Sequence, residues 1–148
     1  MATLPDAVLF ACNLNRVRSP VAAALLRQRL GARVFVDSCG LKPADSVDPF
    51  AAAVMAEVGL DLSGHQPKGF DELEDDSFDL VISLTPEAHH RAGELGRGRA
   101  VELEYWPIYD PTLEVGSREQ RLTAFRNLRA ELGRRLDARF PALQGFGG

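Results

Sequence analysis

The residues best suited to chemistry in this sequence are Cys12 and the Arg18-Ser19 pair that follows it after five intervening residues. Cys12 comes directly after a short apolar run, residues 7–11, and Pro20 opens a helical pattern directly after Ser19. A loop between a buried strand and a helix gathers backbone N–H groups at the positive end of the helix dipole, which forms an anion site. Such a site favours a thiolate over a thiol, so the pattern predicts a nucleophilic cysteine.

The loop is also suited to a tetrahedral oxyanion. The Arg18 guanidinium offers a planar fork to two phosphate oxygens, and the Ser19 hydroxyl can donate to the sulfur. We therefore expect in-line attack by Cys12, a phosphocysteine intermediate and no metal or other cofactor. The competing interpretation is a small buried cysteine at a strand end, but the spacing to Arg18 favours the nucleophile. The predicted phosphate-binding residues are Asn13, Leu14, Asn15, Arg16, Val17 and Arg18.

Departure of the leaving group requires an acid, and Asp110 is the candidate. Pro111 keeps Asp110 extended, and the preceding Trp106-Pro107 segment follows the fourth expected strand. The negative charge of a bound phosphate dianion raises the pKa of a nearby carboxyl group, which is then protonated and can donate its proton. The same dipeptide recurs at Asp48-Pro49, where we expect a structural helix cap, so only its position after the last strand distinguishes Asp110.

The surrounding elements alternate between strand and helix. Apolar runs predict strands over residues 7–11, 33–37, 78–84 and 100–103. Helix starts are predicted at Ser19-Pro20, Asp48-Pro49 and Thr85-Pro86, and Ser117 with Gln120 forms a capping box before the last helix. The pattern predicts an α/β fold with three layers, in which a four-stranded parallel sheet carries helices on both faces. The phosphate-binding loop then follows the first strand, at the ligand-binding edge of the sheet.

Composition limits the class of protein. The 148 residues are expected to form a single domain over 1–148, and a net charge of −4 argues against a nucleic-acid partner. The longest aliphatic run, residues 21–26, is too short for a membrane span, and no signal peptide is visible, so we expect a cytoplasmic protein. Two cysteines exclude a disulfide framework and a recognisable zinc site.

The acidic run 71–76 is expected to be a solvated turn or helix start, and the tail 144–148 to be frayed.

These motifs together resemble the low-molecular-weight protein tyrosine phosphatases, whose fold is shared with thioredoxin-coupled arsenate reductases. The resemblance rests on the 12–20 loop, Asp37-Ser38, the 61–65 segment and Asp110-Pro111, and it covers nearly the whole chain. It implies a hydrolase of phosphorylated proteins or small phosphoesters. It also implies Cys12 as nucleophile, Arg18 as phosphate clamp and Asp110 as general acid. The residues it implies as bracing the loop are Asn15, Ser19, Ser38 and His65.

Several positions depart from the family pattern. Leu14 replaces a glycine, Val17 replaces a second loop cysteine, and Thr112 replaces an aromatic residue after Asp-Pro. Asn13 and Arg16 stand where apolar or small residues are usual. The substrate therefore stays open among phosphotyrosine, phosphoarginine and small phosphoesters, and the oligomeric state is also open. The missing aromatic wall could come from Tyr105, Trp106 or Tyr109, each of which could equally belong to the core.

Two alternatives remain beside the phosphatase. Arsenate mimics phosphate, so an arsenate reductase could use Cys12 with an external thiol, and Cys39 could be a resolving thiol or simply a buried small residue. A phosphate-binding regulatory module without turnover is the other alternative, because Leu14 and Arg16 could distort or fill the loop. Binding alone would need neither Cys12 nor Asp110, which argues against the module.

Overall fold

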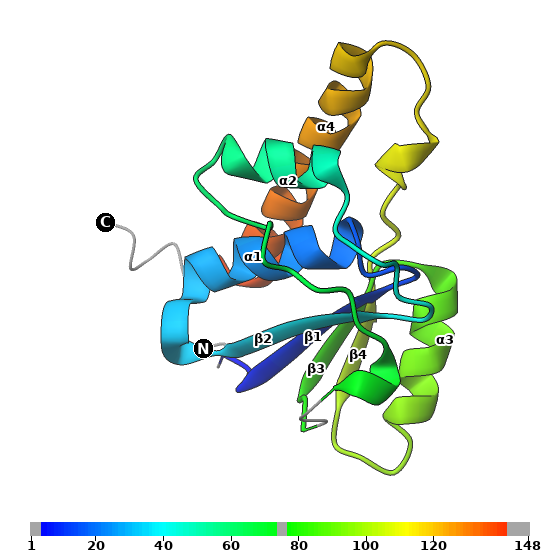
Figure 1. Cartoon of the computed structure of the whole chain (residues 1–148). Coiled ribbons are helices and arrows are strands. Elements are labelled where there is room, and N and C mark those ends of the chain that lie inside the picture. Colours follow the sequence, from blue (N-terminus) through cyan, green and yellow to red (C-terminus); the bar gives the residue numbers. More distant parts are fainter. Residues whose placement is uncertain (1–3, 74–76, 142–148) are drawn as a thin grey trace.

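The computed structural model describes residues 4–73 and 77–141, and its centre is a parallel four-stranded sheet. The strands are β1 (Ala7–Cys12), β2 (Phe35–Gly40), β3 (Leu80–Ser83) and β4 (Glu102–Tyr105), in the order β2-β1-β3-β4 (Figure 1). Every residue of the inner strand β1 is buried, as its unbroken apolar run predicts. The parallel α/β sheet is confirmed. Its second, third and fourth strands begin two residues later than expected, at Phe35, Leu80 and Glu102.

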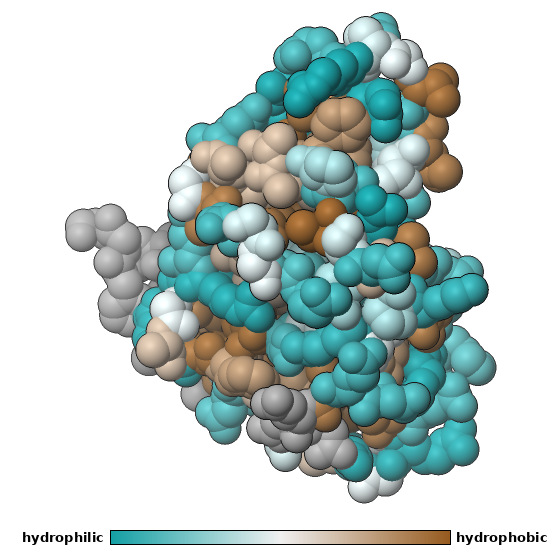
Figure 2. Space-filling view, viewed as in Figure 1, coloured by the Kyte–Doolittle hydropathy of each residue, from teal (hydrophilic) through white to brown (hydrophobic). Residues whose placement is uncertain are grey.

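Helices cover both faces of this sheet, which confirms the three-layer prediction. Figure 1 shows α1 (Arg18–Leu30), α2 (Pro49–Ala56) and α4 (Arg118–Arg139) on one side, and α3 (Pro86–Leu95) on the other. The alternation of β1 explains the division, since Val8 and Phe10 pack in the core with α1 and α4, whereas Leu9 and Ala11 pack with α3. Hydrophilic side chains cover much of the face seen in Figure 2.

The predicted helix caps are confirmed at three of the four helices. Asp48 Oδ1 accepts hydrogen bonds from the amides of Phe50 and Ala51, and Thr85 Oγ1 accepts one from Ala88 N. Ser117 forms the expected capping box at the start of α4. The prediction for α1 is wrong, because Val17 is its N-cap and Ser19 lies within the first turn. The Ser19 hydroxyl is instead directed to the functional loop.

Two sequence predictions lie partly or wholly outside the described residues. The acidic run is described only as far as residue 73, where Asp71 is exposed and lies 3.5 Å from the Arg91 guanidinium. Residues 74–76 and the tail 144–148 are outside the described ranges. Within the described part of the chain, no helix combines the length and apolar character needed to cross a membrane.

Candidate active site

The loop of residues 12–18 joins β1 to α1 at the carboxyl edge of the sheet, and its carbonyls are directed away from its concave side. Each backbone carbonyl from residue 12 to residue 17 accepts a hydrogen bond at 2.9–3.1 Å. The donors, in order, are Leu41 N, Lys42 N, Ala44 N, His65 Nε2, Asp48 N and Val21 N. A carbonyl and the next amide point in opposite directions across a peptide plane, so the loop amides converge on the concave side. This is the arrangement of an anion nest.

Cys12 lies at the base of this nest, with only 2% of its surface exposed. Its Sγ is 2.9 Å from Ser19 Oγ and 3.3 Å from the amide nitrogen of Asn15, which donates to it. Asn15 Nδ2 donates to Ser19 Oγ over 2.8 Å, so the Ser19 proton is free to point to the sulfur. Hydrogen-bonding groups therefore lie on two sides of the sulfur.

Asn15 connects the loop to three other segments of the chain. It is fully buried, and its φ of 54° lies in the left-handed region, which asparagine tolerates better than most residues. Its Nδ2 donates to Ser38 Oγ over 3.0 Å, and its Oδ1 accepts from the backbone amide of Lys68 over 2.9 Å. The structure thus brings together Asn15, Ser19, Ser38 and His65. The contact from Lys68 was missed because a backbone amide leaves no trace in residue type.

His65 completes this network from the mid-chain segment. Its Nε2 lies 2.9 Å from the carbonyl oxygen of Asn15, and because a carbonyl can only accept, Nε2 carries the proton. Burial lowers the pKa of His65 below its ordinary value, and the positive charges of Lys68 and Arg27 act in the same direction. The hydrogen bond to Asn15 opposes this shift. The ring is therefore held as a neutral donor.

Gly40 belongs to the site, although the sequence gives no local signal for it. A Cβ built there would lie 2.8 Å from Asn15 N, 2.9 Å from Asn13 O and 2.9 Å from Leu14 C, all backbone atoms of the loop. A glycine is required because the loop packs directly on the end of β2. A lone glycine after an expected strand carries little signal, since many glycines merely end elements.

Arg18 and Asp110 meet on the other side of the loop. Arg18 Nη1 donates to the carbonyl of Ile108 over 3.0 Å, and its Nη2 is 3.8 Å from Asp110 Oδ2. Asp110 Oδ1 accepts from both the amide and the hydroxyl of Thr112, which fixes the carboxylate orientation. Cys12, Arg18 and Asp110 line one cavity of about 310 Å³. The structure therefore places the three predicted catalytic side chains around a common space.

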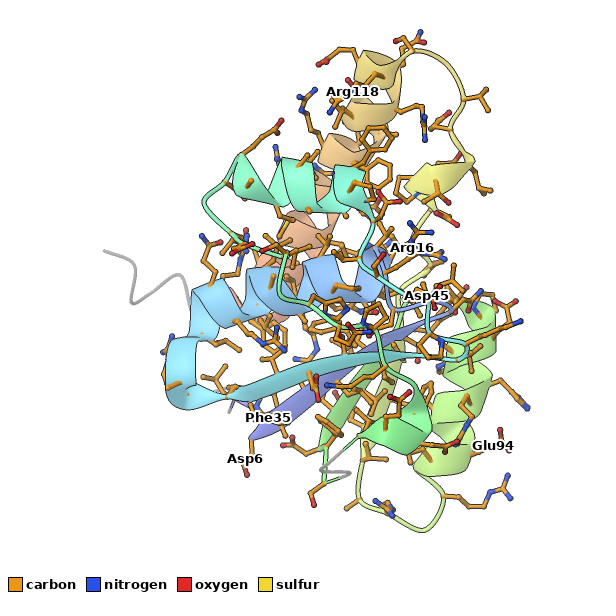
Figure 3. The ribbon with its side chains drawn as sticks, viewed as in Figure 1. Asp6, Arg16, Phe35, Asp45, Glu94 and Arg118 are labelled. Carbon is orange, nitrogen blue, oxygen red and sulfur yellow. The ribbon has the colours of Figure 1, made fainter. Side chains whose placement is uncertain are left out.

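The mouth of this cavity is more charged than the loop sequence suggested. Arg16 Nη2 lies 3.3 Å from Asp48 Oδ2, so Asp48 both caps α2 and holds a loop side chain. Arg121 of α4 also lines the cavity, and Leu14 is 42% exposed at its rim. Figure 3 shows Arg16 beside the start of α1, below the start of α4, where Arg118 is labelled. Arg121 was missed because nothing local links the last helix to the loop.

The candidate aromatic wall divides between core and surface. Trp106 is buried and packs edge-on against Phe10, with ring centroids 6.4 Å apart. Tyr109 is 56% exposed and, with Tyr105, lines an adjoining cavity of about 420 Å³ that shares Arg18 and Asp110. An aromatic surface is therefore available beside the acid, on the side of α3.

Cys39 is poorly placed to resolve a bond to Cys12. It pairs in register with Ala11, so its side chain lies on the opposite face of the sheet from Cys12. It is fully buried in the core beneath α3, and this burial raises the pKa of its thiol far above the ordinary value. These features match the structural alternative for Cys39.

A thiol beneath a ring of amides, at the edge of a parallel sheet, defines a class of enzyme that handles tetrahedral oxyanions through cysteine. Within that class, the chain belongs to the family described as low molecular weight phosphotyrosine protein phosphatase, whose family model matches residues 7–144. The match spans the loop, the bracing network and the Asp110 turn.

Relatives of this chain carry two kinds of activity in their names. The probable low molecular weight protein-tyrosine-phosphatase EpsP of Ralstonia nicotianae is 31% identical over 147 residues, covering 95% of this chain and 97% of the relative. The glutaredoxin arsenate reductase of Synechocystis sp. is 31% identical over 130 residues, covering 88% and 92%. A solved arsenate reductase in the phosphate binding state superposes with a TM-score of 0.75 at 29% identity, covering 93% of this chain and 98% of that one.

Proposed function

We propose that this protein is a phosphomonoester hydrolase, specifically a protein tyrosine phosphatase, that acts through a phosphocysteine on Cys12. The observation that carries the proposal is the outward direction of every loop carbonyl from residue 12 to 17, which turns the amides toward the sulfur. Such a nest holds three phosphate oxygens while the sulfur faces phosphorus. Family membership supports a phosphorylated substrate.

The first step transfers the phosphoryl group to sulfur. The Cys12 thiolate attacks phosphorus, so an S–P bond forms as the P–O bond to the leaving group breaks. Asp110, in its protonated form, gives its proton to the departing oxygen, which leaves as an alcohol. Arg18 and the loop amides carry the negative charge of the equatorial oxygens. For this, Arg18 must exchange its bond to the Ile108 carbonyl for bonds to phosphate.

The second step regenerates the enzyme. A water molecule attacks phosphorus of the phosphocysteine, and the Asp110 carboxylate accepts its proton. The S–P bond breaks, the thiolate returns, and inorganic phosphate leaves. The Ser19 hydroxyl, 2.9 Å from Sγ, stabilises the sulfur as it becomes a leaving group.

Phosphotyrosine is the substrate class that the exposed aromatic surface favours. Tyr109 precedes Asp110 and is more than half exposed on the cavity beside it. A phenyl leaving group in contact with Asp110 can stack there, because aromatic rings attract one another at short range.

The decisive experiment compares Cys12→Ser with Cys39→Ser on an aryl phosphate, a phosphotyrosine peptide and phosphoarginine, in the presence of a chelator. We expect Cys12→Ser to lose turnover and still bind inorganic phosphate, while Cys39→Ser remains active. Unchanged turnover in Cys12→Ser would refute the mechanism. Tight phosphate binding by the unmodified protein without turnover of any ester would indicate the phosphate-binding module instead.

A second candidate, an arsenate reductase, is favoured by the arsenate reductases among the relatives. The Cys12 thiolate would form an S–As bond and displace hydroxide from arsenate, which leaves as water once protonated. An external thiol would then attack Sγ, reducing As(V) to arsenite and forming a mixed disulfide that a second thiol must reduce. The external thiol is required because Cys39 faces away from Cys12. Arsenate-dependent thiol consumption that vanishes in Cys12→Ser would support this candidate.

A further inference from the structure

The mouth of the Cys12 cavity carries guanidinium groups beyond the one that the phosphate needs. Arg16 from the loop and Arg121 from α4 line it together with Arg18. The Arg121 guanidinium carbon lies 4.6 Å from the centre of the Phe50 ring, and that of Arg118 lies 5.6 Å from the same centre. Cation–π contact therefore holds two arginines of α4 at the start of α2, where Phe50 lies. Figure 2 shows hydrophilic side chains at the top of the molecule, where α4 begins.

The acidic groups nearby neutralise only part of this set, since Asp110 Oδ2 lies 3.8 Å from Arg18 Nη2 and no carboxylate of the described residues pairs with Arg121. Asp48 pairs with Arg16, but its other oxygen is occupied in capping α2. Glu119, which lies between the two α4 arginines in sequence, pairs with Arg126 at 2.8 Å. Arg118 and Arg121 consequently have no carboxylate partner among the residues that the structure describes.

Arg16 has an unused donor at the same place. Within the described residues, its Nε is buried and has no hydrogen-bond partner, although its Nη2 contacts Asp48. A buried donor without an acceptor is unfavourable, so the Arg16 side chain gains a hydrogen bond if it turns its Nε to an anion bound in the cavity. Arg121, which has no carboxylate partner among the described residues, therefore lines the same cavity as Arg16 and its unpartnered Nε.

We infer that Arg16 and Arg121 form a subsite for a second anionic group of the substrate, adjacent to the phosphate held by Arg18. The inference rests on the proposed function, because the scissile phosphate ester is the first anion. The second anion is a carboxylate or another phosphate, supplied by an acidic residue beside a phosphotyrosine or by a small dianionic ester. Both sources present the same chemistry to the guanidinium groups.

Two substrate pairs test the subsite and distinguish the two sources of the second anionic group. One pair is a phosphotyrosine peptide flanked by aspartates and the same peptide flanked by alanines. The other is 4-carboxyphenyl phosphate and 4-carbamoylphenyl phosphate. We expect the acidic member of at least one pair to have a kcat/KM about three- to fivefold higher at low salt, as exposed charge pairs allow. The preference should shrink toward unity at about 1 M salt, where charges are screened within roughly 3 Å.

Substitutions of Arg121 test whether the cavity mouth causes the preference for the acidic substrates. Arg121→Gln should reduce the acidic-to-neutral ratio to near unity, and Arg121→Glu should invert it. Arg134→Gln is the matched control, since it removes the same charge from an exposed position farther along α4. An equal loss in Arg134→Gln would attribute the preference to net charge, and an unaltered ratio in both Arg121 variants would also overturn the inference.

Binding to the Cys12→Ser variant separates this inference from the proposed function. Calorimetry with the same esters should show tighter binding of the acidic member, lost when Arg121→Gln is added. If the wild-type protein hydrolyses neutral esters but neither binds nor prefers acidic ones, the subsite is refuted while the phosphatase stands. If no ester is hydrolysed yet the acidic one binds more tightly, the phosphatase fails and the subsite stands.

Discussion

Ser19 Oγ lies 2.9 Å from Cys12 Sγ, although the two residues stand at opposite ends of the phosphate loop. The hydroxyl is oriented by Asn15 Nδ2, which donates to it over 2.8 Å. The competing acceptor for its proton, the Cys39 carbonyl, is farther away at 3.4 Å. Ser19 is therefore prepared to donate to a charged sulfur, both before attack and as the thiolate leaves.

Replacing Ser19 with alanine should slow turnover more than it weakens phosphate binding. A hydrogen bond to a charged group contributes about 1.5–3 kcal/mol, so we expect kcat to fall about 10- to 100-fold. Steady-state kinetics on an aryl phosphate would measure this, with Ser63→Ala at an exposed position as control. A kcat equal to that of the control would show that Ser19 only braces the loop.

Gly40→Ala should displace the phosphate loop, because the new methyl group would come within 3.0 Å of three loop backbone atoms. Crowding of this kind costs about 1–3 kcal/mol, so phosphate binding should weaken by roughly 5- to 150-fold. The matched control is Gly69→Ala, where a Cβ has no neighbour nearer than 3.6 Å. Calorimetric phosphate titration and urea unfolding would measure both effects. Equal phosphate affinities in the two variants would contradict the packing argument.

Asp110→Asn should slow turnover according to the leaving group. The amide oxygen can still accept the bonds from Thr112, so the turn is preserved while the proton donor is lost. General acid catalysis contributes about 10²–10⁴-fold, so phenyl phosphate should lose roughly 100-fold or more. A nitrophenyl ester, whose leaving group needs little protonation, should lose far less. Equal slowing of both esters would remove the acid role of Asp110.

The histidine in the bracing network predicts a pH-dependent stability. Burial lowers the pKa of folded His65 below the value near 6.5 expected in the unfolded chain. Between these two pKa values the unfolded chain binds more protons than the folded protein. The contribution of His65 to the stability of the fold is therefore complete above about pH 6.5 and is lost as the pH falls through the folded pKa.

Urea unfolding across this pH range, compared between the wild-type protein and His65→Gln, would isolate the contribution of His65. The difference in unfolding free energy should shrink as the pH falls below about 6.5. His90→Gln, at an exposed position of α3, is the control. A difference that stays constant with pH would show that His65 does not titrate on unfolding.

The signals that predicted the fold correctly were local. Asp48, Thr85 and Ser117 cap helices through bonds to amides two or three residues away, so residue type and spacing are sufficient to identify them. Ser19 also precedes a proline at a predicted helix start, but it does not cap α1. Its hydroxyl bonds to Cys12 and Asn15 across the loop, and such competition is invisible to a rule based on neighbouring residues.

The sequence alone determined the nucleophilic loop, since strand, Cys12, Arg18 and helix are contiguous and their order defines an anion site. What supports and surrounds that loop depends on contacts between segments that are far apart in the sequence. Gly40 lies against it because β2 pairs with β1 in register, and Arg121 reaches its mouth because α4 packs beside α1. Contacts of this kind depend on strand order and helix packing, which arise from burial of the whole core and leave little trace at the contacting residues.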